Sequence, residues 1–188
     1  MSKSKNIVIG VSGGIAAYKV CDLIRRLKDK KFDVHVIMTR HAQEFVTPLT
    51  FQTLSQNPVH TNHFELSQEK EIDHISLAEH ADILVIAPAT ANIIAKIRTG
   101  ICDDLLTTVV CATRAPVVVA PSMNANMWEN PITQDNLKHL RQLGYHILEP
   151  ESGDLACGYT GKGRLPETET ILSFVQKVLG LKSPSKKK

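Results

Sequence analysis

The chain has 188 residues, of which 43% are hydrophobic and 22% are charged. These are ordinary values for a globular domain, and a chain of this length can bury a core without disulfides or metals. The net charge is +3, but four lysines lie in the segment 182–188 and the rest of the chain is near neutral, so composition gives no reason to expect nucleic acid as a partner. No apolar run approaches the roughly 18–20 residues of a membrane span, so no membrane contact is expected. We therefore expect one domain over 1–181, followed by a disordered basic tail over 182–188.

The four cysteines, Cys21, Cys102, Cys111 and Cys157, show no spacing typical of a metal site. The short polar stretch 1–5 leads directly into a predicted strand and lacks the apolar segment of a signal peptide. We therefore expect a cytoplasmic protein in which these cysteines are reduced thiols and no metal ion is bound.

The chain begins with a predicted strand, a glycine-rich turn and a helix. Residues 6–11 form an apolar run, Ser12, Gly13 and Gly14 predict a tight turn, and 15–28 has the spacing of an amphipathic helix. Glycine lets the backbone approach an anion, and the start of a helix offers N–H groups to it. The turn is therefore a candidate phosphate site, while the alternative is a glycine-rich turn present for purely steric reasons.

The second predicted strand, 32–38, is followed by Thr39, Arg40 and His41. A dinucleotide-binding domain normally has an acidic residue near this point to bind a ribose. A hydroxyl, a cation and an imidazole suit a phosphate better, and the glycines of the first turn do not follow the pattern G-x-G-x-x-G. Both observations favour a mononucleotide cofactor over NAD. Alternatively, Arg40 and His41 are solvated loop residues.

Two further buried strands are predicted over 82–87 and 116–120. Thr90 and Asn92 follow the first, and the segment 121–128, Pro-Ser-Met-Asn-Ala-Asn-Met-Trp, follows the second. In open α/β sheets the ligand lies outside the carboxyl ends of the strands, so these side chains are expected to line a small-molecule pocket. The alternative is that the methionines and the tryptophan of 121–128 only pack at the start of a helix.

The segment 74–81 predicts a short helix that begins at His74. The N-terminus of a helix disfavours imidazolium, so a histidine there stays neutral and can act as a base. An isolated histidine can equally be structural, and that alternative stays open.

The segment 150–166 predicts a long loop, because its glycines exclude a stable helix. Lys162 and Arg164 offer cations to an anionic ligand, and Cys157 lies close to them in sequence, where positive charge lowers the pKa of a thiol. Such a loop can close over a pocket as a lid. The alternative is an ordinary mobile loop.

Strands and helices alternate along the chain, which predicts an α/β fold, a three-layer α/β/α Rossmann-like (flavodoxin-like) parallel sheet. A short strand at 58–59 and a last strand at 145–148 complete the predicted sheet. The remaining helices are expected over 47–56, 93–97 and 105–113, from residue 130 onward, and over 167–181.

Four stretches together resemble the homo-oligomeric flavin-containing cysteine decarboxylases, and the resemblance covers roughly residues 5–180. The pattern Pro-x-Met-Asn-x-x-Met-Trp is highly specific for that family. Thr90 stands where the family has serine, which preserves the hydroxyl, and Tyr159 stands where the family has an acid after Ala-Cys-Gly. The stretches are 10–19 (Gly-Val-Ser-Gly-Gly-Ile-Ala-Ala-Tyr-Lys), 88–92 (Pro-Ala-Thr-Ala-Asn), 121–128 and 155–164, with His-Ile-Ser-Leu at 74–77.

The resemblance implies an FMN-binding parallel sheet with strand order 3-2-1-4-5-6. It implies assembly as a homotrimer or a homododecamer, with the flavin at a subunit interface. The implied activity is the FMN-dependent decarboxylation of 4′-phosphopantothenoylcysteine to 4′-phosphopantetheine in coenzyme A biosynthesis, through thioaldehyde and enethiol intermediates.

The resemblance also implies roles for individual residues. His74 would be the catalytic base, Cys157 the late proton donor, and Asn124 the residue that binds the substrate carboxylate. The other implied substrate-binding residues are Met123, Ala156, Lys162 and Arg164. The implied cofactor-binding residues are Ser12, Gly13, Gly14, Ile15, Thr39, His41, Thr90, Ala91, Asn92 and Ser122.

Two alternatives within the family stay open at this point. A peptidyl-cysteine decarboxylase of lantibiotic maturation stops at the enethiol and needs no late proton donor, so Cys157 argues against it. A non-catalytic regulatory flavoprotein would carry a long acidic extension, whereas this sequence has a short basic tail and retains His74 and Cys157.

Overall fold

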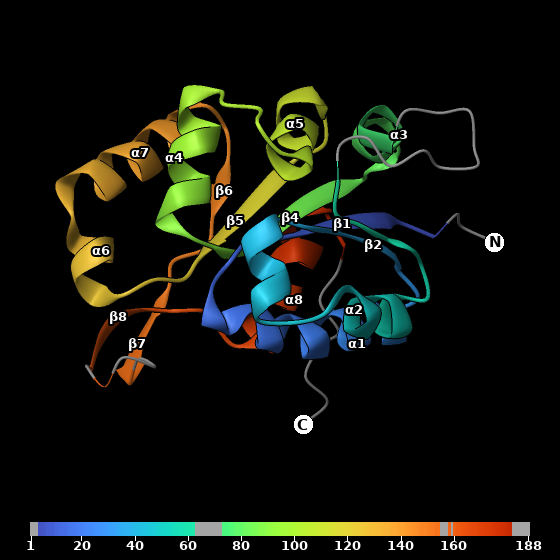
Figure 1. Cartoon of the computed structure of the whole chain (residues 1–188), viewed down its shortest axis with the longest axis horizontal. Helices are drawn as coiled ribbons and strands as arrows, with labels where there is room; N and C mark the ends of the chain where they lie inside the picture. Colours follow the sequence, from blue (N-terminus) through green and yellow to red (C-terminus); the bar gives the residue numbers. More distant parts are fainter. Residues whose placement is uncertain (1–3, 63–72, 155–157, 159, 182–188) are drawn as a thin grey trace.

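The structure, a computed structural model, describes residues 4–62, 73–154, 158 and 160–181, and only the backbone of Asp73 and His74. Six strands form one parallel sheet in the order β3-β2-β1-β4-β5-β6, which confirms the order implied by the resemblance (Figure 1). The strands are β1 (Asn6–Val11), β2 (Asp33–Met38), β3 (Val59–His60), β4 (Ile83–Ala89), β5 (Val117–Pro121) and β6 (His146–Ile147).

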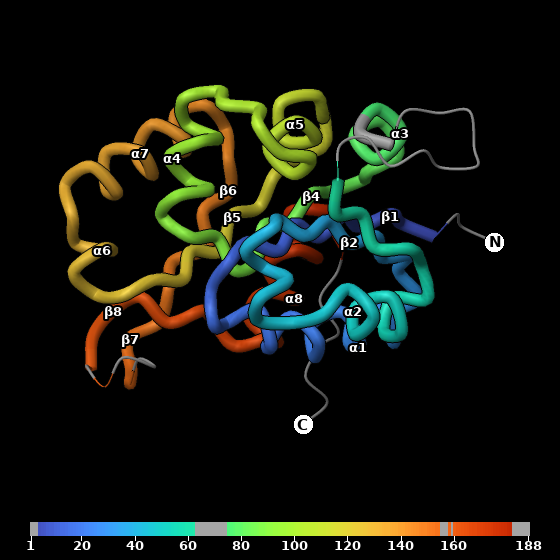
Figure 2. Tube along the Cα trace, in the orientation of Figure 1, coloured from blue at the N-terminus to red at the C-terminus, as the bar shows by residue number. Residues whose placement is uncertain are grey.

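Helices cover both faces of the sheet, and Figure 2 shows them below and above it in the same view. This arrangement confirms the predicted three-layer fold. One layer contains η1 (Ile15–Lys19), α1 (Val20–Asp29), α2 (Pro48–Ser55) and α8 (Thr168–Val178). The other contains α3 (Asp73–His80), α4 (Ala91–Thr99), α5 (Leu105–Ala112) and α7 (Pro131–Gln142).

The alternation of side chains along each strand divides the core between these two layers. Ile7 and Ile9 of β1 belong to the cluster that contains Leu23 of α1. Val8, between them, belongs to the opposite cluster with Leu106 of α5. Because both faces of the sheet are covered, the central strands can be apolar at consecutive positions, which explains the unbroken apolar runs in the sequence.

The prediction of a loop over 150–166 is wrong near both ends of this range, where the structure has strands. Residues Glu151–Asp154 form β7 and Thr160–Arg164 form β8, which pair as an antiparallel hairpin. A Cβ atom at Gly163 would lie 2.2 Å from the Met123 carbonyl oxygen, and Gly163 has a φ of +149°. The glycines that exclude a helix therefore allow β8 to lie directly against the segment that follows β5.

Two local differences lie near the glycine-rich turn. The single helix predicted over 15–28 is a 3₁₀ helix, η1, followed by α1, and Arg40 and His41, for which a solvated loop was the alternative, begin a second 3₁₀ helix, η2 (Arg40–Glu44). The basic tail predicted over 182–188 lies outside the described residues. Within the part of the chain that is described, no helix is long and apolar enough to cross a membrane.

Candidate active site

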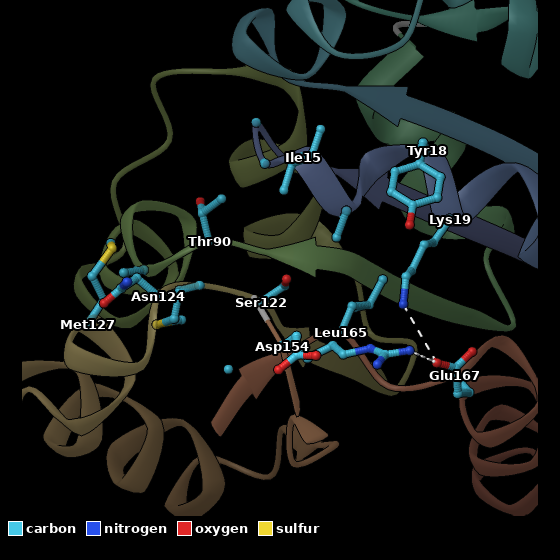
Figure 3. Close-up of a pocket in the computed structure, with 17 residues that line it drawn as sticks. Ile15, Tyr18, Lys19, Thr90, Ser122, Asn124, Met127, Asp154, Leu165 and Glu167 are labelled. Carbon is cyan, nitrogen blue, oxygen red and sulfur yellow. Dashed lines mark hydrogen bonds and ion pairs between the residues drawn. The ribbon is translucent and has the colours of Figure 1, made fainter. Parts of the chain in front are cut away.

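A cavity of about 810 Å³ lies at the carboxyl edge of the sheet, where β1, β4 and β5 end. Its walls come from the turn before η1, the start of α4, the segment between β5 and α6 (Ala125–Glu129), the hairpin β7–β8 and the residues before α8 (Figure 3). Its size lies within the usual range for a small-molecule site.

Ser12 connects the glycine-rich turn to the neighbouring strand. Its side chain is buried, and its hydroxyl donates a hydrogen bond of 2.6 Å to the Pro88 carbonyl oxygen. The same hydroxyl accepts a hydrogen bond of 3.0 Å from the Thr90 backbone N–H. The structure therefore places Ser12 beneath the cavity, where it holds the ends of β1 and β4 together.

Glycine at position 13 is required by the packing of η2. A Cβ atom there would lie 2.4 Å from Cβ of His41. Thr39 begins η2, and its hydroxyl accepts a hydrogen bond of 3.3 Å from the Ala42 N–H. Thr39 and His41 thus lie behind the glycine-rich turn and support it, while Gly13 and Gly14 themselves face the cavity.

Thr90 forms the N-cap of α4, since its hydroxyl accepts a hydrogen bond of 3.3 Å from the Ile93 N–H. Thr90 and Ala91 line the cavity beside the glycine-rich turn. The start of α4, a helix of nine residues, therefore faces the same space as Gly13 and Gly14. Backbone N–H groups and a positive helix end are the features that bind phosphate.

The segment after β5 is held from two directions. The Ser122 N–H donates 3.0 Å to the Ala89 carbonyl oxygen, and the Met123 N–H donates 2.9 Å to the Gly163 carbonyl oxygen. Asn124 is the N-cap of α6, because its Oδ1 accepts a hydrogen bond of 2.8 Å from the Asn126 N–H. This contact fixes the orientation of the Asn124 amide at the cavity wall.

Charged side chains gather on the wall formed by η1, β8 and the start of α8. Lys19 Nζ lies 3.7 Å from Glu167 Oε1, and the Arg164 guanidinium also pairs with Glu167 (Figure 3). Asp154 at the end of β7 lines the cavity as well, and it accepts a hydrogen bond of 2.7 Å from the Thr160 hydroxyl.

Lys162, predicted to bind substrate, has a different environment. Its Nζ lies 2.8 Å from Glu149 Oε2 and 5.2 Å from the centre of the Trp128 ring. Trp128 is a buried residue of α6, so this cation lies against that helix. Lys162 does not belong to the described lining of the cavity.

The structure brings many of the predicted site residues to this one cavity, from four separate parts of the sequence. Those that line it are Gly13, Gly14, Ile15, Thr90, Ala91, Ser122, Met123, Asn124 and Arg164. Those that are described but do not line it are Ser12, Thr39, His41, Asn92 and Lys162. Ala156, Cys157 and the side chain of His74 lie outside the described residues.

Sequence reasoning missed part of the lining. Tyr18 and Lys19 belong to the stretch 10–19 that carried the resemblance, so their position in the sequence was a signal. Asp154 and Glu167 gave no signal, because an acid beside a glycine or at a helix start is common. The lining residues that were not predicted are Ala16, Tyr18, Lys19, Met127, Asp154, Gly163, Leu165 and Glu167.

The residues present fit a flavin mononucleotide. A phosphate group suits the glycine-rich turn and the start of α4, which face the cavity together. Ile15, Met123 and Leu165 supply apolar wall for a flat ring system, and Asn124 adds a fixed amide. A cavity with apolar walls and a few convergent polar groups is typical of a cofactor site.

Residues 1–180 match the family model described as Flavoprotein. The chain is 48% identical to the Coenzyme A biosynthesis bifunctional protein CoaBC of Bacillus subtilis, over 94% of this chain and 44% of the relative. It is 42% identical to a protein of Streptococcus mutans described as "Probable phosphopantothenoylcysteine decarboxylase", over 94% of this chain and 99% of the relative. The chain thus spans less than half the length of the bifunctional relative and nearly all of the other.

Solved structures agree with these matches. A PPC decarboxylase mutant complexed with pantothenoylaminoethenethiol superposes with a TM-score of 0.83 and 31% identity, over 93% of this chain and 98% of the other. The FMN-dependent cysteine decarboxylase SpaF superposes with a TM-score of 0.80 and 31% identity, over 93% of this chain and 95% of the other. The resemblance stated from the sequence motifs is confirmed, and the chain belongs to the Flavoprotein family.

Proposed function

We propose that this protein binds FMN and decarboxylates 4′-phosphopantothenoylcysteine to 4′-phosphopantetheine, a step of coenzyme A biosynthesis. One observation carries the proposal: 42% identity spans 99% of a probable phosphopantothenoylcysteine decarboxylase, and many of the predicted site residues line the cavity at the carboxyl edge of the sheet. The bifunctional relative of Bacillus subtilis, whose name includes coenzyme A biosynthesis, supports the same step.

The chemistry explains the groups around the cavity. The substrate nitrogen is acylated and cannot form a Schiff base, so loss of CO₂ needs another electron sink. FMN, when bound at the glycine-rich turn and the start of α4, supplies that sink as a hydride acceptor. Asn124 would orient the substrate by donating a hydrogen bond from Nδ2 to its carboxylate. The surrounding side chains of Ile15, Met123 and Leu165 limit the access of water.

Two proton transfers are assigned to residues outside the described side chains. A base must remove the thiol proton before oxidation at the adjacent carbon, and we assign this step to the imidazole of His74. A proton must be returned when the enethiol is reduced, and we assign this step to the thiol of Cys157. Asp154 and Thr160, which flank the segment containing Cys157, lie at the end of the hairpin beside the cavity.

We further propose that the enzyme is a homotrimer or a multiple of it, in which a neighbouring copy completes each site. Helix α3, which carries His74, lies at the opposite end of the molecule from the hairpin β7–β8 (Figure 1). At the cavity mouth, Ile15 is 55% exposed, Tyr18 58% and Met127 47%, which is a large apolar surface for a monomer. A second copy would cover this surface and could bring His74 to it.

These assignments describe a cytoplasmic enzyme that acts on a small molecule and has no role for nucleic acid or a membrane. A second candidate is decarboxylation of a cysteine within a peptide, because the peptidyl-cysteine decarboxylase EpiD also superposes, with a TM-score of 0.76 and 25% identity over 92% of this chain. The two activities differ in their final product, since the peptide reaction ends at the enethiol.

The test combines a visible spectrum with product mass. The purified protein should be yellow, release FMN on heating, and convert 4′-phosphopantothenoylcysteine to 4′-phosphopantetheine and CO₂. The His74→Asn variant should retain FMN but leave it oxidised under anaerobic mixing with substrate. An enzyme that releases another cofactor, or that converts only a cysteine-terminated peptide and stops at the enethiol, would contradict the proposal.

A further inference from the structure

Two cations from distant parts of the chain meet one carboxylate on the cavity wall. Lys19 ends η1, Arg164 ends β8, and Glu167 is the N-cap residue of α8. Lys19 Nζ lies 3.7 Å from Glu167 Oε1, and the Arg164 guanidinium pairs with the same oxygen. All three residues line the cavity. Figure 3 shows Lys19 directed toward Glu167, on the opposite side of Ser122 from Asn124.

Glu167 is not needed in this position to begin α8. As N-cap residue it makes no side-chain capping hydrogen bond. Its backbone N–H instead donates 3.1 Å to the carboxylate of Glu151. The Glu167 side chain is 56% exposed, so it can turn toward solvent without disturbing the helix start. Another anion can therefore replace the Glu167 carboxylate as the partner of Lys19 and Arg164.

Lys19 and Arg164 are the cations in the described lining of the cavity, where Asp154 and Glu167 are the anions. Lys162, the nearest other cation in sequence, is paired with Glu149. A substrate with both a carboxylate and a phosphate binds more tightly where the protein offers a partner to each charge. Asn124, the proposed partner of the substrate carboxylate, lies on one side of the cavity, and Lys19 and Arg164 lie on the other.

We propose that Lys19 and Arg164 form the subsite for the phosphate group of the substrate, with Glu167 as the counter-ion that the phosphate displaces. The inference rests on the proposed function for the identity of the substrate. An arginine fork can bind two phosphate oxygens at once, and a lysine adds a point charge to the third. The substrate would then extend from Asn124 across the cavity to this charged wall, apart from the glycine-rich turn that suits the cofactor phosphate.

The inference is tested with two substrates, 4′-phosphopantothenoylcysteine and the same molecule without its phosphate. Lys19→Met should raise KM for the phosphorylated substrate by about 10- to 100-fold, the usual range for losing a charged hydrogen bond. The KM for the unphosphorylated substrate and kcat for both should stay near the wild-type values. Lys19→Arg, which keeps the charge, should retain most of the preference for phosphate.

Two further variants separate this role from a structural one. Glu167→Gln should lower KM for the phosphorylated substrate and leave the other unchanged, because it removes the competing charge. Arg26→Met is the matched control. It also breaks a pair with an acid near the start of α8, Glu169 at 3.1 Å, but Arg26 is absent from the described cavity lining. It should affect both substrates equally or not at all.

Three outcomes would overturn the subsite. The first is an equal rise in KM for both substrates in Lys19→Met, and the second is no rise in KM for either. The third is loss of bound FMN from Lys19→Met, which would assign the cations to the cofactor phosphate. If Lys19→Met does not fold, the KM values of Glu167→Gln and Lys19→Arg for the two substrates still test the subsite. If the wild type converts neither substrate, the proposed function fails by itself. In that case, calorimetry with inorganic phosphate tests the subsite. Phosphate should bind more weakly to Lys19→Met than to Arg26→Met.

Discussion

The Thr90 backbone N–H donates a hydrogen bond of 3.0 Å to the Ser12 hydroxyl, which itself donates 2.6 Å to the Pro88 carbonyl oxygen. Ser12 follows β1 and Thr90 follows β4, so this one side chain joins the two loops that face the cavity. Ser12 is only 2% exposed, so its hydroxyl bonds to Pro88 and Thr90 inside the protein rather than to solvent. The spacing of these two cavity-facing loops therefore depends on Ser12.

The Ser12→Ala substitution should lower the free energy of unfolding by about 1–3 kcal/mol, because it removes the Ser12 hydroxyl from its buried bond to Pro88 and leaves the partly buried Thr90 N–H without its acceptor. FMN affinity should fall as well, since both loops lose their common support. Urea unfolding and flavin titration measure the two effects. Thr53→Ala is the control, because it removes a hydroxyl that bonds to Leu49 O on an exposed helix surface. An unfolding free energy for Ser12→Ala equal to that of the control would contradict this role.

The family resemblance implied that Ser12 binds the cofactor, but the sequence did not predict its contacts in the structure. A hydroxyl beside two glycines resembles a direct phosphate ligand, and only the register of β1 against β4 reveals that it turns inward to Pro88 and Thr90. The sheet itself was predictable, since buried parallel strands have unbroken apolar sequences. The strand order came from the family resemblance, because periodicity alone does not determine which strands are neighbours.

The hairpin β7–β8 and the charged wall were not predictable for a related reason. Glycines in 150–166 are poor strand formers, and they are acceptable only because Gly161 and Gly163 face the segment after β5. Likewise, Lys19 and Glu167 are far apart in the sequence and meet only through the packing of η1 against the start of α8. Long-range contacts of this kind leave no local pattern.

The Gly163→Ala substitution should destabilise the hairpin and impair substrate binding. Gly163 combines a φ of +149° with a Cβ position 2.2 Å from the Met123 carbonyl oxygen. Gly180→Ala is the matched control, since Gly180 also has a positive φ, +68°, but nothing lies within 4 Å of its Cβ position. The strain of a positive φ alone costs about 1–3 kcal/mol in either variant. Gly163→Ala should therefore lower the free energy of unfolding by more than Gly180→Ala, because its new Cβ also meets the Met123 carbonyl oxygen. Equal losses would show that the close approach to Met123 is unimportant.

The Asn124→Asp substitution should impair substrate binding while leaving the stability of the protein unchanged. Aspartate is as good an N-cap as asparagine, so the hydrogen bond to the Asn126 N–H and the stability should persist. The new charge would face the substrate carboxylate, and kcat/KM should fall by more than about tenfold. Asn124→Ala should lose both properties, with about 1 kcal/mol lost from the cap. Normal turnover by the stable aspartate variant would remove Asn124 from carboxylate binding.

Cys157→Ser should stop the reaction after decarboxylation. Serine is nearly isosteric with cysteine, but its hydroxyl is far less acidic than a thiol, so proton return to the enethiol should fail. CO₂ should be released while the flavin stays reduced and the enethiol mass accumulates in a single turnover. A purely structural cysteine would tolerate serine with unchanged product. Formation of 4′-phosphopantetheine by this variant would reopen the peptidyl-cysteine alternative.

Mixing His74→Asn with Cys157→Ser tests whether one site uses two copies of the chain. Cys157 lies between β7 and β8, whose ends line the cavity, whereas His74 lies on α3 at the far end of the molecule (Figure 1). If a neighbouring copy supplies His74, some interfaces of a mixed oligomer contain both intact residues. Random exchange of two variants in a head-to-tail ring gives about a quarter of the wild-type rate, although each variant alone is inactive.

The mixture must be unfolded and refolded together, or coexpressed with two affinity tags, so that hetero-oligomers form. Each variant mixed with itself is the control for refolding losses. Recovery of activity would place His74 and Cys157 of one site on different chains and would require an oligomer for catalysis. If the mixed oligomers form but stay inactive, both residues act within one chain, and α3 must then approach the cavity of its own subunit.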